Sequence, residues 1–429
     1  MKNRRWALLT LLLFLVNLFP LGCWDYQEVD ETAYVLVLGF DKGKENKLTV
    51  TAQIAAPRRI AGGGAGGMPS QEGGPAGAKT TEVVTAEAPT AVASFNMLNT
   101  FVNRRISMKH TKVVVFSEEL AREGLLPFLR VIGRYPEFRR NIFIGVARGV
   151  SARELLEKNQ PVLEINPSKY VELATLASKY TGLSMTQPFL NRYYNAVYSL
   201  GSEPAAIMWG LKRQTPPGEG TPIQHPYGWR SEGDYLSGAI PRSGGNPVEQ
   251  IGSALFKGDK MVGEITGDQT TAMVMMRNQL NQSLYSLPDP LEPQLVDMVS
   301  ILQRRPPKFK IDVSEPVPKI SIQIPLEGYV EGIQGHSNYE DPSFRPILEE
   351  AVAERITRDV VGLLQKTQAL GIDTLGIGTR AKVHFLTWQE WVDYNWNEVY
   401  PQASIDVKVI VNLHSFGLLR KNAEEPARK

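Results

Sequence analysis

Cysteine is almost absent from this chain of 429 residues, since Cys23 is the only one. A single cysteine excludes an intrachain disulfide, a thiolate zinc site and a redox-active cysteine pair. Histidine is scarce as well, and the five histidines lie too far apart in the sequence to form a metal-binding pair on one helix. The sequence therefore predicts neither a metal centre nor a cofactor.

The chain also lacks an excess of positive or negative charge. The formal net charge is +2, and three positive residues, Lys2, Arg4 and Arg5, lie in the first five positions, which leaves −1 for the rest. No basic field is available to hold nucleic acid, so we expect no nucleic-acid partner. Hydrophobic residues make up 42% of the chain, which is enough for packed cores and excludes general disorder.

The first 22 residues have the layout of a bacterial secretory leader. A basic start is followed by the uncharged, apolar stretch 6–22, and the small residue Gly22 directly precedes Cys23. We predict a lipoprotein signal peptide at 1–22, whose removal leaves Cys23 at the amino end with a diacylglycerol on its thiol. The alternative is an uncleaved signal anchor, since about 17 apolar residues can just span a bilayer. Lipidation is favoured because the only cysteine stands where this chemistry requires one.

The remaining chain is expected outside the cytoplasm, held to the membrane by its lipid. Two acyl chains anchor a protein stably where one is marginal. No later segment has an apolar run long enough to span a bilayer.

Strand and helix patterns alternate through the first part of the mature chain. Short apolar or alternating runs predict strands near 34–40, 48–54, 112–117 and 141–147. Helical patterns are found at 91–107, at 118–133, from 151 onward with Ser151 as the N-cap, and at 171–200. This order predicts an N-terminal α+β domain at 24–205, in which the glycine-rich segment 61–79 forms a flexible loop.

A second polar stretch, rich in proline and glycine, covers 213–246 and belongs to an expected middle domain at 206–304. In this domain Gly258 and Asp259 predict a hairpin turn. Asp268 is expected to cap a methionine-rich helix whose methionines fill a core.

The C-terminal domain is expected at 305–420. Its longest helix is predicted at 342–370, with Asp341 as the N-cap and Gly371 as the residue that ends it. The last strand alternates apolar and polar residues, with Ile405, Val407, Val409, Val411 and Leu413 on one face. The predicted fold class is therefore α+β with three domains, mixed or antiparallel sheets packed with helices, and a long helix across the C-terminal sheet.

Motifs that mimic catalytic sites lack the context that the chemistry needs. The Gly-x-Gly-x-x-Gly at 62–67 has no strand before it, and the similar motif at 376–381 follows the end of a helix. His110 has no nucleophile-elbow serine as a partner. Glu340 and Asp341 are adjacent carboxylates, which we interpret as the start of the long helix rather than as an acid–base pair. No enzyme is predicted.

His384, Trp388, Glu390 and Trp391 form the richest polar and aromatic cluster. The cluster is either a docking surface or a set of packed tryptophans around a hydrogen-bonded histidine. We favour the packed arrangement.

Several blocks, in this order, resemble the Ger(x)C family, the lipoprotein C subunits of nutrient germinant receptors in endospore-forming bacteria. The blocks are GCWDYQEV at 22–29, the strand ending LGFDK at 33–42, HTKVVVFSEELA at 110–121, GSALFKGDKMVG at 252–263 and the segment 376–391 with the last strand. In the first block Gln27 and Val29 replace the commoner arginine and leucine. The likeness covers residues 22 to about 418.

This resemblance implies a non-enzymatic, lipid-anchored subunit on the outer face of the spore inner membrane, needed for germination in response to nutrients. It implies polytopic A-type and transporter-like B-type subunits as partners. Cys23 is the only functional position that it carries over. Two further hypotheses are an envelope lipoprotein that itself binds a nutrient, and an envelope hydrolase, for which the chain offers no motif.

Overall fold

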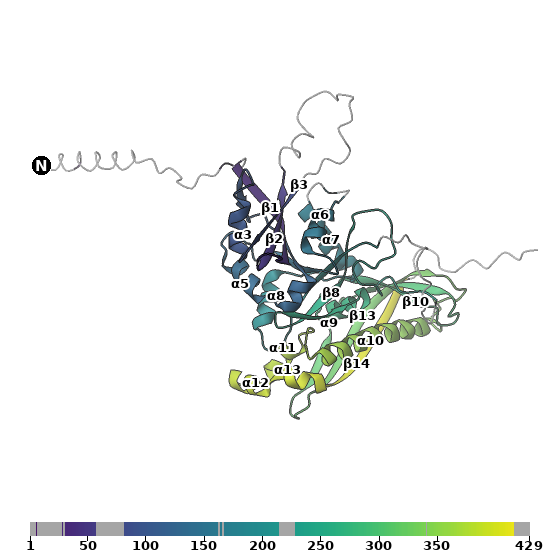
Figure 1. Ribbon diagram of the computed structural model, residues 1–429. Helices are drawn as coiled ribbons and strands as arrows, with labels where there is room; N and C mark the ends of the chain where they lie inside the picture. The colour runs from purple at the N-terminus through teal and green to yellow at the C-terminus, as the bar shows by residue number, and fades with distance from the viewer. Residues whose placement is uncertain are drawn as a thin grey trace, which may run out of the picture.

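The computed structural model describes residues 31–56, 81–161, 167–213, 228–339 and 341–415, together with the single residues Trp6, Glu28 and Glu164. Within these residues two β-sheets packed with helices form the body of the molecule, so the α+β class with mixed sheets is confirmed (Figure 1). The leader, Cys23 and the 61–79 loop lie outside the described residues, and the expected three-domain boundaries stay a prediction. No helix in the described part of the chain has the length and apolarity to cross a membrane.

The first sheet has nine strands in the order β3-β2-β1-β5-β6-β7-β8-β9, with β4 beside β1. The strands are β1 (Thr32–Lys42), β2 (Leu48–Ala55), β3 (Thr81–Ala88), β4 (Arg105–Ser107), β5 (Val113–Ser117), β6 (Phe143–Ala147), β7 (Ala205–Leu211), β8 (Val248–Lys257) and β9 (Lys260–Ile265). The central strands β1, β5, β6 and β7 are parallel, and the pairs towards both edges are antiparallel.

Helices cover both faces of this sheet, which explains the unbroken apolar sequences of its central strands. In β5, Val113 and Val115 enter one core, whereas Val114 and Phe116 enter the other. One face packs against α3 (Ala91–Leu98), α4 (Glu118–Glu123), α5 (Leu126–Arg134) and α8 (Leu190–Tyr198). The other packs against α6 (Ala152–Lys158), α7 (Pro167–Thr181) and α9 (Gly267–Met276).

Two predicted helices are shorter in the structure. The helix expected at 91–107 ends at Leu98, because Asn99 Oδ1 accepts the Ile106 N–H and turns the chain into β4. The helix expected at 118–133 is split into α4 and α5 at Gly124, whose φ of 130° lies in a region that favours glycine. Ser151 caps α6 as predicted, since its Oγ accepts the Glu154 N–H.

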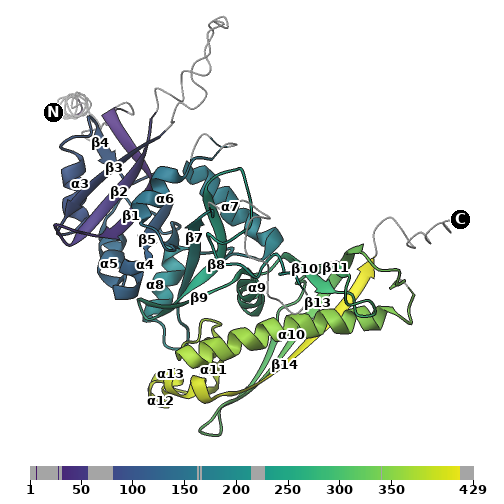
Figure 2. The same cartoon turned by 45° about the vertical axis from the view of Figure 1, so that its right-hand side comes forward.

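The second sheet has five strands in the order β10-β11-β13-β12, with β14 also beside β13 (Figure 2). The strands are β10 (Gln282–Pro288), β11 (Val296–Leu302), β12 (Lys308–Asp312), β13 (Lys319–Ile333) and β14 (Ser404–Ser415). Every pair is antiparallel except β13 with β14. The long helix α10 (Arg345–Leu370) lies across β13 and β14, as predicted.

Short helices connect α10 to the last strand at one end of this sheet (Figure 1). They are α11 (Ile377–Ala381), η2 (Lys382–His384), α12 (Trp388–Tyr394), α13 (Trp396–Val399) and η3 (Tyr400–Gln402).

The predicted helix starts need correction, while one predicted end is confirmed. The N-cap of α9 is Thr266, which forms a capping box with Gln269, so Asp268 lies in the first turn instead. α10 begins at Arg345, and Asp341 Oδ1 accepts the Ser343 N–H in the preceding turn. Gly371 ends α10 with a left-handed φ of 64°, as expected.

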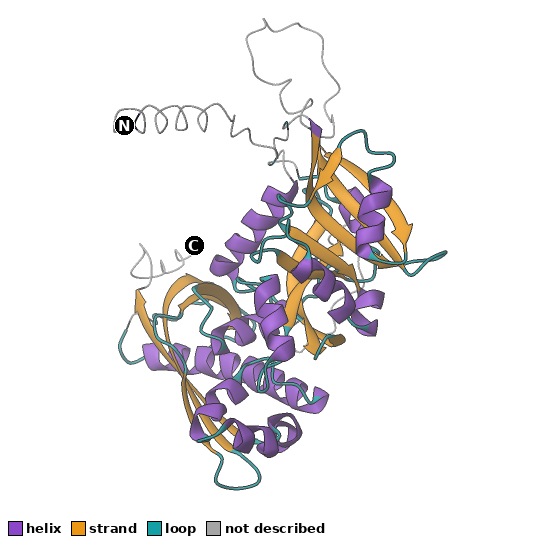
Figure 3. Cartoon of the chain, turned by 90° about the vertical axis from the view of Figure 1, so that its left-hand side faces the viewer, coloured by secondary structure: helices purple, strands orange, loops and turns teal. Residues whose placement is uncertain are grey.

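Figure 3 shows the two sheets in separate parts of the molecule with helices between them. The two sheets share one continuous core, and polar contacts connect them. Arg355 on α10 forms an ion pair of 2.6 Å with Asp268 on α9. The Lys366 ammonium donates to the Glu264 carbonyl oxygen at 2.6 Å. These contacts fix α10 against the first sheet as well as its own.

Candidate functional site

A cavity of about 460 Å³ lies where α8 of the first sheet meets the α11 segment of the second. Its wall carries three arginines, Arg192, Arg277 and Arg380, and one carboxyl group, that of Glu203. Apolar side chains such as Phe189 complete the lining. This volume is in the range of small-molecule sites, which are about 300–1,000 Å³.

Two of the arginines are held by backbone carbonyl groups. Arg277 Nε donates to the Thr374 carbonyl at 2.7 Å, and Arg380 Nη1 donates to the Gly376 carbonyl at 2.9 Å. The pKa of Arg277 is lowered to about 10, mainly by burial, because the charges of Arg192 and Arg380 add to the shift while the Asp373 carboxylate opposes it. The side chain of Arg192 is exposed and makes no ion pair or hydrogen bond within the described ranges.

The one carboxyl group of the wall balances little of this charge. Burial raises the pKa of Glu203, whose Oε2 accepts the Gly258 N–H at 2.7 Å. Tyr193 Oη and Gln279 Oε1, which also belong to lining residues, are buried without a partner among the described residues. The cavity thus combines positive charge, unpaired polar atoms and apolar surface, which fits a small organic anion.

The glycine motif at 376–381 surrounds a buried carboxylate. Asp373 Oδ1 accepts the N–H groups of Leu375 and Ile377, and Oδ2 accepts the Gly378 N–H at 2.6 Å and the Trp396 indole N–H at 3.0 Å. A Cβ on Gly378 would lie 2.4 Å from the Trp396 nitrogen, so this glycine permits the close packing. The motif therefore packs Asp373 against Trp396 in the core beside the second sheet.

The aromatic cluster that includes His384 is divided between core and surface. Trp391 is buried and stacks on Trp396 with ring centroids 6.0 Å apart. His384 is exposed, as is Trp388, over which the Lys382 ammonium lies at 4.2 Å. The predicted packing of tryptophans around the histidine is therefore wrong.

The remaining candidates from the sequence do not converge. His110 is exposed and contacts the Tyr34 ring edge-on at 4.6 Å. Cys23 and Glu340 lie outside the described residues. In the part of the chain that the structure describes, no group of three or more histidine, cysteine or acidic residues could hold a metal ion.

Sequence reasoning missed a pair of buried carboxyl groups beside β11. Asp289 Oδ1 accepts the Tyr339 hydroxyl at 2.6 Å, and Asp297 is fully buried with neither oxygen hydrogen-bonded in the described chain. Burial and the neighbouring Asp289 raise the pKa of Asp297 to about 7. Asp289 and Asp297 are eight positions apart across a hairpin, and no local sequence pattern indicates that they meet. The meeting of the three cavity arginines has no local sequence pattern either.

Comparison with known proteins adds two family matches. Residues 25–208 match the spore germination protein N-terminal domain, and residues 251–417 match the spore germination B3/GerAC-like C-terminal domain. The chain belongs to the Ger(x)C family. This confirms the family resemblance described above.

Relatives of this Ger(x)C chain align along nearly their whole length. The putative spore germination protein YfkR of Bacillus subtilis (strain 168) is 26% identical over 95% of this chain and 96% of its own. Spore germination protein KC of the same organism is 22% identical, with 97% of each chain covered. A solved structure, the crystal structure of the GerBC protein, has a TM-score of 0.49 and 14% identity over 88% of this chain and 96% of that one.

Proposed function

We propose that this Ger(x)C protein is a non-enzymatic subunit of a nutrient germinant receptor, attached to the outer face of the spore inner membrane through a diacylglycerol on Cys23. The observation that carries the proposal is the match of both family segments in one chain, 25–208 and 251–417. Relatives named as spore germination proteins cover the same span. Polytopic A-type and B-type subunits are the proposed partners.

The positions of the family blocks support a scaffold role. The block at 33–42 is β1, and its Asp41 accepts the Ala152 N–H at 2.7 Å and the Arg153 N–H at 2.9 Å at the start of α6. The block at 110–121 contains β5, and the block at 252–263 contains the hairpin of β8 and β9. These three blocks build the sheet and its helix contacts and do not line the cavity, whereas the block at 376–391 contributes Gly376, Thr379 and Arg380 to the cavity wall.

The anchor explains how a protein without catalytic chemistry can act in a membrane receptor. A lipid confines the protein to the plane that its partners occupy, which raises their effective concentration, so modest contact surfaces are sufficient.

Cys23→Ala tests the anchor. We expect a folded protein that is lost from the spore membrane fraction and a weaker germination response, because the thiol that carries the lipid is gone. Fractionation, intact mass of the mature chain and nutrient-triggered germination measure these effects. Full membrane retention and normal germination of the variant would contradict the proposal.

A detergent pull-down of the tagged, lipidated protein from spore membranes tests the partners. Polytopic receptor subunits should co-purify with it. A protein recovered alone under conditions that preserve membrane complexes would contradict the subunit role.

The cavity favours a second function, in which the protein itself binds a small nutrient that carries a carboxylate. Calorimetric titration of the full chain with a panel of amino and hydroxy acids tests this function. Arg192→Gln should weaken any binding, whereas Arg139→Gln, at an exposed arginine outside the cavity, should not. No binding across the panel would rule out nutrient recognition here.

A further inference from the structure

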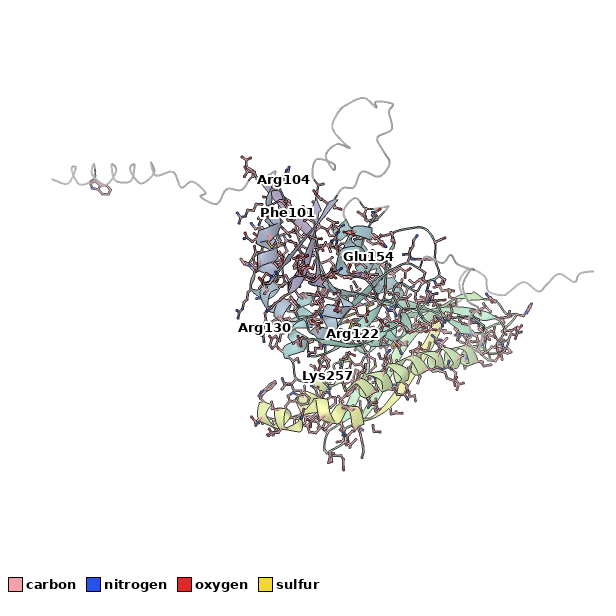
Figure 4. The ribbon with its side chains drawn as sticks, in the orientation of Figure 1. Phe101, Arg104, Arg122, Arg130, Glu154 and Lys257 are labelled. Atoms are coloured by element: carbon pink, nitrogen blue, oxygen red, sulfur yellow. The ribbon has the colours of Figure 1, made fainter. Side chains whose placement is uncertain are left out.

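An exposed apolar and basic surface lies at the end of the first sheet where β1 begins. We call it the α3–β4 surface and define it by Met97, Phe101, Arg104, Arg105 and Lys109. Met97 in the last turn of α3 and Phe101 just after the helix are 45% and 58% exposed, and neighbouring exposed apolar side chains can mark an interaction surface. Figure 4 shows Phe101 and Arg104 close together beyond the end of α3.

This surface lies beside the point where the chain from the amino terminus enters the fold. Thr32, the first residue of β1, pairs directly with Arg105 of β4, and Ala33 pairs with Ile106. Thr32 is the ninth residue after Cys23. A fully extended chain of that length spans about 30 Å at most, so a lipid on Cys23 would hold the α3–β4 surface close to the bilayer.

The segment that carries the α3–β4 surface, residues 89–116, contains basic but no acidic residues. Between Ala88 and Ser117 there is no aspartate or glutamate, whereas Arg104, Arg105, Lys109 and Lys112 are basic. Neither the Arg104 nor the Arg105 side chain makes an ion pair or hydrogen bond in the described part of the chain. Such unpaired guanidinium groups are free to contact phosphate groups.

Three acidic residues of the described chain lie near this region: Glu137, and Glu28 and Glu31 ahead of β1. Glu137 Oε2 accepts the Met108 N–H at 2.7 Å and the Ser107 hydroxyl at 3.2 Å. Glu31 is exposed just before β1. The three basic side chains of the α3–β4 surface equal these acidic residues in number, and only the Glu137 carboxylate is hydrogen-bonded to the surface's own segment.

We propose that the α3–β4 surface is a second membrane contact, in which Phe101 and Met97 enter the headgroup region and Arg104, Arg105 and Lys109 bind anionic phospholipid headgroups. The inference rests on the proposed lipid anchor and deepens it. Lipid chain and basic patch together form the two-signal arrangement that holds peripheral proteins to a bilayer. The contact would also fix the orientation of the first sheet relative to the membrane, which a tether alone leaves free.

Exchange between vesicles tests the contact. The full chain, with its lipid verified by intact mass, is loaded into phosphatidylcholine vesicles with or without phosphatidylglycerol, and its transfer to acceptor vesicles is timed. Release from the phosphatidylglycerol vesicles should be the slower, and high salt should remove the difference because it screens headgroup charge. Equal release from both vesicle types at low salt would overturn the proposal.

Charge reversal has a matched control in this chain. R104E/R105E should speed release from phosphatidylglycerol vesicles by about tenfold or more, since one basic residue at an anionic surface is worth about fivefold. R304E/R305E makes the same charge change at two exposed, adjacent arginines before β12 and should leave the rate within about twofold. Equal acceleration by both pairs would show a general charge effect and overturn the specific contact.

Phe101→Ser tests the apolar part without changing charge. It should speed release from both vesicle types, whereas Leu386→Ser, at a leucine that is 95% exposed on the segment before α12, should not. No change with Phe101→Ser would remove the insertion step from the proposal.

The proposal of a lipid on Cys23 and the proposal of a membrane contact at the α3–β4 surface can be refuted separately. If intact mass shows an unmodified Cys23, the lipid proposal is wrong, and flotation of that unmodified chain with phosphatidylglycerol vesicles still reports on the surface. Flotation that R104E/R105E abolishes would support the surface, and flotation that the variant leaves intact would refute it.

Discussion

Replacement of Asp373 should be among the most damaging single changes in the second sheet. The side chain is 1% exposed and its two oxygens accept four hydrogen bonds, from the N–H groups of Leu375, Ile377 and Gly378 and from the Trp396 indole. Trp396 in turn packs against Trp391 and Tyr400. Loss of the carboxylate would therefore affect the loop before α11 and the aromatic core together.

The size of the effect follows from the donors left behind. Each buried donor without a partner costs about 1–3 kcal/mol, and local shifts or water would satisfy some of the four. For Asp373→Ala we expect a loss of about 4 kcal/mol in the free energy of unfolding. Asp373→Asn keeps the shape but presents an NH₂ group to one pair of donors, so we expect about 2–3 kcal/mol.

Urea unfolding of the purified chain, followed by tryptophan fluorescence, measures both variants. Asp312→Asn is the control, because Asp312 is an exposed aspartate that accepts from Ser314 N–H and Oγ in a surface turn, and its loss should cost at most about 0.5 kcal/mol. If Asp373→Ala unfolds at the same urea concentration as the control, the reasoning from unpaired donors is wrong.

Two further predictions concern stability. Gly145→Ala should lower the melting temperature by several degrees, because a Cβ there would lie 2.1 Å from the ring of the buried Trp209; an unchanged temperature in a thermal scan would contradict this packing. Asp297→Asn should change the pH dependence. Since the pKa of Asp297 is raised to about 7, this group contributes stability below about pH 4 that is lost as the pH rises through 7. The variant should thus gain stability relative to wild type between pH 5 and 8, and parallel pH profiles would refute the assignment.

Much of the secondary structure could be predicted because its signals are local. Alternation marked β2 and β14, the unbroken apolar run marked β5, and Gly371 marked the end of α10. The sequence did not predict β3, which follows a glycine-rich stretch, or β4, which has only three residues. These two segments are strands because β3 pairs with β2 and β4 pairs with β1. Pairing with a distant segment leaves no mark on a short sequence.

The candidate site was less predictable for the same reason. Arg192, Arg277 and Arg380 come from three separate elements and meet only in the folded chain. The exposure of His384 was also hidden, because Trp388 and Trp391 look alike in sequence while one faces solvent and the other the core. Periodicity identifies a buried face only where a helix is longer than the seven residues of α12.

The nine-stranded sheet joins the two family segments into one folding unit. β7 begins inside the first family segment, which ends at 208, and β8 enters the second, which begins at 251; the two strands pair from Ala205 with Leu255 to Leu211 with Val248. Recombination between two genes of this family within the intervening stretch would bring together strand edges that had never been selected to match. The N-terminal and C-terminal segments of each protein should therefore have been inherited together. Hybrids that combine segments from two relatives should misfold unless β8 and β9 come from the same protein as the N-terminal segment.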